Sequence, residues 1–120
     1  MLQHLKNLYD IICINGDLHE LIEKFYQSNP YFEDWTETDV PILKREHLLD
    51  AIRRFKEGNL SASDLYTWAE FLEMHEFLEY EENYSEQIVN VLFELANPEI
   101  NQNINITLCN NLEKTLKRLE

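Results

Sequence analysis

The chain has 120 residues, of which 44% are hydrophobic and 28% are charged, a composition typical of one globular domain with one core. Its two glycines and three prolines are too few for collagen-like or turn-dense all-β architectures. The formal net charge of −13, from 23 acidic and 10 basic residues, disfavours direct binding of nucleic acid.

Helical spacing of apolar residues predicts two short helices at the start of the chain. The first covers residues 2–14 and is followed by Asn15-Gly16, which can terminate it. The second begins with a capping box at Asp17 and continues to Asn29-Pro30. Residues 31–40 combine aromatic and acidic side chains without a helical period, so we expect an ordered loop there.

The middle of the chain predicts two longer helices. A basic helix is expected over residues 42–57, with Gly58 just after its last turn. Carboxylates alternate with its cations at helical spacing, which favours a solvated face over an RNA-binding one. A capping box at Ser61 predicts that the next helix begins at Ala62, and the apolar pattern weakens over residues 74–80.

Two further helices complete the expected fold. Asn83 with Glu86, or Ser85 alone, is expected to cap a helix that ends at Asn97-Pro98. Four leucines at helical spacing then predict a terminal amphipathic helix: Leu108, Leu112, Leu116 and Leu119. We therefore predict an all-α, single-domain irregular bundle of about six helices over residues 1–120.

The sequence lacks the motifs of the common catalytic and metal sites. No Glu-x-x-His pair of the kind used by di-metal carboxylate proteins occurs, and two glycines 42 positions apart cannot form a phosphate-binding loop. Cys13 and Cys109 belong to no metal or disulfide motif, which fits reduced thiols. Because a signal peptide and a membrane-spanning run are also missing, we expect a cytoplasmic protein without enzymatic activity, cofactor or metal.

The acidic residues are unevenly distributed. Residues 57–113 contain twelve Asp and Glu residues but no Lys or Arg, whereas the rest of the chain is nearly neutral. Like charges three or four positions apart on a helix repel each other by about 0.2–0.5 kcal/mol per pair. A plain solvated face remains possible for any one of them, but the array as a whole favours a cationic partner. The predicted contact residues are Glu70, Glu73, Glu76, Glu79, Glu81 and Glu82.

A second acidic cluster surrounds a tryptophan in the expected loop over residues 31–40. An aromatic side chain ringed by acids is typical of a binding hot spot for a basic protein, although Trp35 could instead fill the core. The predicted contact residues of this cluster are Glu33, Asp34, Trp35 and Glu37.

Three segments of the chain carry a resemblance to a known group of proteins. They are Leu48–Glu70, Phe77–Glu81 and Val91–Ile100, within residues 43–105. They contain a Gly-x-Leu-Ser turn, a Trp-Ala pair, a short Tyr-Glu connection and a Leu-Ala-Asn-Pro stop. In these features the chain resembles small helical immunity proteins of bacterial toxin–immunity systems, including contact-dependent growth inhibition. The resemblance implies a helical bundle that neutralises a toxin.

Charge and resemblance together predict an immunity protein that binds a cognate toxin as a monomer in a 1:1 complex. A nuclease such as an RNase or tRNase must be basic to hold phosphates, so an acidic inhibitor suits it. The acidic surface would cover the active site or the substrate-binding surface of the toxin. The alternative is an acidic nucleic-acid mimic, or an adaptor, that occupies a basic surface of a host protein.

Overall fold

The computed structural model describes residues 3–27, 41–74, 78–98 and 103–117, which contain six α-helices and two strands of two residues each. The prediction of an all-α bundle of about six helices is therefore confirmed. In chain order the elements are α1 (Gln3–Cys13), α2 (Leu18–Gln27), β1 (Ile42–Leu43), α3 (Arg45–Lys56), α4 (Ala62–Met74), β2 (Glu79–Tyr80), α5 (Ser85–Ala96) and α6 (Ile106–Lys117).

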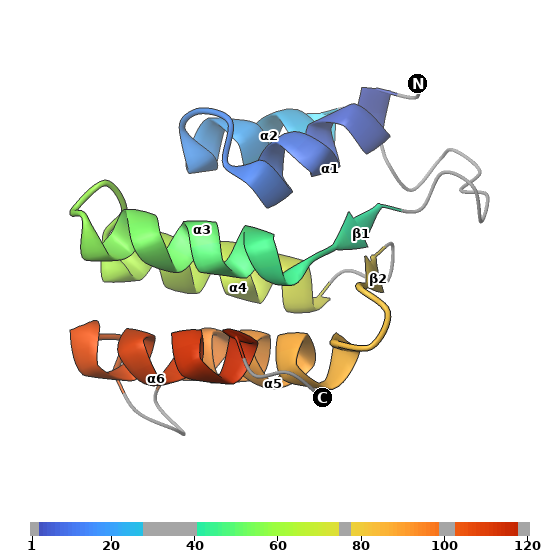
Figure 1. The fold of residues 1–120 in the computed structure, drawn as a ribbon. Helices are drawn as coiled ribbons and strands as arrows, with labels where there is room; N and C mark the ends of the chain where they lie inside the picture. The colour runs from blue at the N-terminus through green and yellow to red at the C-terminus, as the bar shows by residue number, and fades with distance from the viewer. Residues whose placement is uncertain (1–2, 28–40, 75–77, 99–102, 118–120) are drawn as a thin grey trace.

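The helices form three stacked layers of two helices each (Figure 1). The α1/α2 pair lies on one side of the α3/α4 pair, and the α5/α6 pair lies on the other side, with α5 against α4 and α6 against α3. Because the middle layer is covered on both sides, α4 buries Leu65, Trp68 and Leu72 completely. The indole Nε1 of Trp68 donates a hydrogen bond to the carbonyl oxygen of Ile11 at 2.9 Å, which joins α4 to α1.

Two helix starts follow the predicted local rules. The Asp64 N–H donates to Ser61 Oγ at 3.0 Å, and the Ser61 N–H donates to the Asp64 carboxylate at 3.3 Å. This reciprocal pair is the predicted capping box, and α4 begins at Ala62 as expected. At α2, Asp17 Oδ1 accepts the Glu20 N–H at 3.0 Å.

The ends of α1 and α3 use the same hydrogen-bond pattern with different residues. After α3, Gly58 has φ +84°, and the Asn59 N–H donates to the Arg54 carbonyl at 2.8 Å. After α1, the left-handed position is taken by Ile14 with φ +52°, two residues before Gly16. A β-branched residue there costs about 1–2 kcal/mol. Ile14 is buried and its carbonyl accepts the Arg54 Nη1 at 2.8 Å, so tertiary contacts hold the strained residue.

The predicted start of the basic helix at residue 42 was wrong. Ile42 and Leu43 form β1, which pairs in parallel with Glu79 and Tyr80 of β2, and α3 begins only at Arg45. The Glu79 N–H donates to the carbonyl of the residue before β1, and β1 and β2 lie more than thirty residues apart in sequence. Local periodicity cannot detect such a partner.

The predicted caps of the fifth helix were also wrong. The N-cap of α5 is Tyr84, which makes no side-chain capping bond, and Asn83 before it adopts a left-handed φ of +73°. The guanidinium of Arg45 lies 3.5 Å above the Tyr84 ring, so a tertiary contact occupies this position. In the last helix, Asn105 Oδ1 accepts the Leu108 N–H at 2.8 Å.

Candidate functional site

Half of the predicted contact residues lie outside the residues that the structure describes. These are Glu33, Asp34, Trp35, Glu37 and Glu76. Their assignment to a binding surface stays a prediction. The structure does place the other five, which are Glu70, Glu73, Glu79, Glu81 and Glu82.

The end of α4, the strand β2 and the start of α5 lie at one end of the molecule (Figure 1). These segments carry four exposed glutamates. We call this group the acidic end; it consists of Glu73, Glu79, Glu82 and Glu86, all exposed. Within the described parts of the chain, none of the four makes an ion pair with a Lys or Arg. Burial, with a smaller contribution from the charge of Glu73, raises the pKa of Tyr80 in the same region.

The carboxylates of Glu70 and Glu81 are half-buried and bond to other groups of the protein. The Glu70 carboxylate accepts a hydrogen bond from the Tyr66 hydroxyl one turn earlier on α4. Glu81 Oε1 accepts the backbone N–H of Arg45 at 3.0 Å and lies 3.6 Å from the Arg45 Nε. A carboxylate at this position satisfies a free N–H at the positive end of the α3 dipole. The two predicted contact residues therefore have structural partners.

The cations of α3 are used mainly in intramolecular contacts. Arg53 bonds to Asp50 and Glu57, and Arg54 bonds to Asp50, so the expected pairing is confirmed for these two of the three carboxylates that alternate with the cations; the third is Glu46. Burial alone would raise the pKa of Asp50, but the bonds and charges of both arginines outweigh it and lower that pKa. Lys56 reaches α6 through Glu113, with Nζ 2.7 Å from Oε1. Arg53 and Lys56 nevertheless remain exposed, so the charges of this helix are paired on a solvated face.

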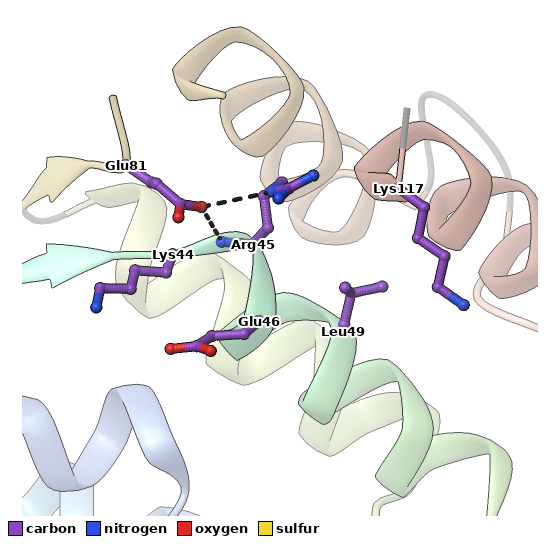
Figure 2. A pocket seen from close by; sticks show the side chains of 6 residues that line it. All are labelled: Lys44, Arg45, Glu46, Leu49, Glu81 and Lys117. Carbon is purple, nitrogen blue, oxygen red and sulfur yellow. Dashed lines mark hydrogen bonds and ion pairs between the residues drawn. The ribbon is translucent and has the colours of Figure 1, made fainter. Parts of the chain in front are cut away.

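A pocket of about 450 Å³ lies where the N-terminus of α3, the end of α6 and the turn before α5 meet (Figure 2). Its lining residues are Lys44, Arg45, Glu46, Leu49, Glu81 and Lys117. The Arg45 guanidinium is held on two sides: Nη1 donates to the Leu116 carbonyl at 3.1 Å, and the group stacks on Tyr84. Its buried Nε lies 3.6 Å from Glu81 Oε1 and makes no hydrogen bond within the described residues.

The pocket does not converge on one point. In Figure 2 the ammonium groups of Lys44 and Lys117 point away from the Arg45–Glu81 pair and from each other. Its polar groups instead connect α3 to α6 and to the turn before α5 through Arg45 and Glu81. We therefore interpret the pocket as a structural contact between layers and not as a binding site.

The residues that sequence reasoning missed lie on the outer side of α5. Val89 and Phe93 are 43% and 46% exposed, although their neighbours Ile88 and Leu92 are buried in the core. Beside them a groove of about 390 Å³ runs between α5 and α6. Its lining residues are Asn90, Val91, Phe93, Glu94, Leu112 and Thr115. The sequence did contain a signal that could have identified Val89 and Phe93, because the apolar residues of this helix cover more than one face.

The described residues show little reactive chemistry. Burial raises the pKa of the Cys109 thiol to about 11, so the thiolate is scarce at neutral pH. In the described ranges, no three His, Cys, Asp or Glu side chains are grouped so that they could bind a metal ion. Each helix that the structure describes is too short or too polar to cross a bilayer.

Neither the family models, the curated proteins nor the solved structures match this chain.

Proposed function

We propose that this protein is an immunity protein that binds a cognate basic toxin, a nuclease of the RNase or tRNase type, and neutralises it by covering its active site or its substrate-binding surface. The observation that carries the proposal is the acidic end: Glu73, Glu79, Glu82 and Glu86 are exposed together without a described cationic partner. A positively charged protein surface complements such a group.

The distribution of ion pairs supports this proposal. The arginines Arg45, Arg53 and Arg54, together with Lys56, each contact an acid that lies outside the acidic end. Among the described residues, these cations thus pair with carboxylates along α3 or across to other elements, and no Lys or Arg pairs with the acidic end. Surface carboxylates that repel each other weaken the isolated fold slightly and attract a cationic partner.

Electrostatic attraction also suits the task of an inhibitor. Complementary charges raise association rates from about 10⁵–10⁶ to about 10⁸ M⁻¹s⁻¹ or more at low salt. A toxin made in the same cell must be captured before it acts, so fast association is an advantage. The substrate site of a nuclease carries cations that bind phosphates. The carboxylates of the acidic end can bind the same cations.

Co-expression with the protein encoded directly upstream tests the proposal. We expect the two proteins to co-purify as a 1:1 complex and cells that express both to survive. The double variant Glu79→Lys/Glu82→Lys should associate at least about tenfold more slowly at low salt. A charge-matched control, Glu20→Lys/Glu23→Lys on α2, changes the net charge equally at exposed positions away from the acidic end.

Two results would contradict the proposal. One is the lack of any complex with the upstream product, or cell death despite co-expression. The other is an equal loss of association rate in both double variants, because only overall charge would then matter. A charge reversal that weakens binding to many unrelated basic proteins alike would favour the nucleic-acid mimic instead.

A further inference from the structure

We propose, building on the function above, that the outer side of α5 is the docking site for a cationic amphipathic helix of the partner protein. The apolar anchor is the pair Val89 and Phe93, and the groove between α5 and α6 beside Phe93 receives the apolar side chains of that helix. Glu86 and Glu94 lie at the two ends of the anchor and bind the cations of the docked helix.

The apolar part of the site has the geometry of a helix-binding surface. Val89 and Phe93 are four residues apart on one helix, which places them one turn and about 6 Å apart along its axis. The groove next to Phe93 also reaches two side chains of the core, Val91 and Leu112. A groove between two helices accepts the side-chain ridge of a third helix.

The charges around this anchor select the occupant. Glu86 precedes Val89 by almost one turn and is exposed, and Glu94 follows Phe93 and lines the groove. Their separation of eight residues corresponds to about 12 Å along the helix axis. A bound helix therefore needs two apolar residues one turn apart, between Lys or Arg residues seven or eight positions apart.

The same charges argue against a second copy of this chain as the occupant. A copy carries a formal net charge of −13 and would bring the same glutamates against each other. The stretch 57–113, which contains all of α5, has no Lys or Arg to offer. The two α6 residues that line the groove, Leu112 and Thr115, are uncharged, and Lys117 of the same helix lines the pocket near α3 instead.

A synthetic peptide tests the docking site without the natural partner. The probe is a fluorescent helical peptide of about 18 residues with two leucines one turn apart and lysines seven positions apart. A second peptide has the same composition in scrambled order. Fluorescence anisotropy at low salt measures the binding of each peptide to the wild-type protein and to its variants.

Two matched pairs of variants identify the surface. Phe93→Ala is compared with Ile106→Ala, because the two side chains are almost equally exposed, at 46% and 47%. Glu86→Lys is compared with Glu23→Lys, which changes the charge equally at an exposed position on α2. Circular dichroism confirms that each variant folds; Phe93 is exposed enough that its truncation leaves the core intact.

We expect Phe93→Ala and Glu86→Lys each to weaken binding of the patterned peptide about tenfold, and the two controls by less than about twofold. Equal affinity of the wild-type protein for the patterned and scrambled peptides would overturn the docking site, as would equal affinity of Phe93→Ala and Ile106→Ala. If the peptide binds as expected but the upstream protein does not, the docking site stands and the proposed identity of the partner fails. If the upstream protein binds and Phe93→Ala leaves its affinity unchanged, only the docking site fails.

Discussion

Glu81 and Glu82 are adjacent in sequence, yet the structure predicts opposite consequences for their replacement by glutamine. Glu81 bonds to the backbone of Arg45 at the start of α3, whereas Glu82 is exposed and has no ion pair with a described Lys or Arg. Glu81→Gln should therefore destabilise the fold. Glu82→Gln should leave the free energy of unfolding within about 0.5 kcal/mol of wild type.

The expected size of the effect follows from the contacts of Glu81. A hydrogen bond to a charged acceptor contributes about 1.5–3 kcal/mol, and a carboxylate at a helix N-terminus adds about 0.3–1 kcal/mol. The 3.6 Å ion pair with Arg45 is partly exposed and adds little. Because the glutamine oxygen still accepts the N–H, we expect a net loss of about 1–2 kcal/mol, or about 4–8 °C in Tm.

Urea unfolding followed by far-ultraviolet circular dichroism measures both variants, and the same samples are tested for binding to the upstream protein. We expect Glu81→Gln to lower the unfolding midpoint, and Glu82→Gln to lower only the association rate. Equal unfolding free energies for the two variants would refute the structural role of Glu81. It would then be free to act as the contact residue that the sequence predicted.

Three further outcomes follow from two buried side chains and one half-buried side chain. Trp68→Phe should lose about 2–4 kcal/mol of unfolding free energy, since it removes the bond to the Ile11 carbonyl and leaves a cavity; thermal unfolding measures it. Gln87 is 7% exposed and its Oε1 has no hydrogen-bond partner in the described structure, so Gln87→Leu should stabilise the fold by about 1 kcal/mol; a lower urea midpoint would count against this. Burial lowers the pKa of His47, whose Nδ1 accepts the Lys44 N–H at 2.9 Å. Its contribution is therefore complete above the unfolded pKa of about 6.5 and is lost as the pH falls through the lower folded pKa. Urea unfolding between pH 7.5 and 5 should show a greater loss for wild type than for His47→Gln, and parallel profiles would exclude this role.

Features that depend on neighbouring residues could be predicted from the sequence. The capping box at Ser61 is one example, because both of its hydrogen bonds lie within one helical turn. The number of helices followed from apolar spacing for the same reason. The predictions for Ile42 and for the cap of α5 failed where a partner far along the chain decides the conformation: Ile42 pairs with Glu79, and Tyr84 lies under Arg45.

The candidate site was predictable only in part for a related reason. Composition identifies an acidic stretch without cations, and Glu73, Glu79 and Glu82 are indeed exposed. It cannot reveal that Glu81 bonds to a residue 36 positions earlier, because that contact depends on how the layers stack. Nor can it distinguish Phe93 from its buried neighbour Leu92 before the packing partners of α5 are known.

The separation of faces along α5 has a consequence for how such a protein can change over generations. Its core positions, Ile88, Leu92 and Leu95, alternate with outward positions such as Val89 and Phe93, and the two sets share no residue. Substitutions on the outward set fall among those that usually alter stability by less than about 0.5 kcal/mol. If the outer side of α5 is the docking site proposed above, its specificity can change at Val89 and Phe93 while Ile88, Leu92 and Leu95 keep the helix packed in the core.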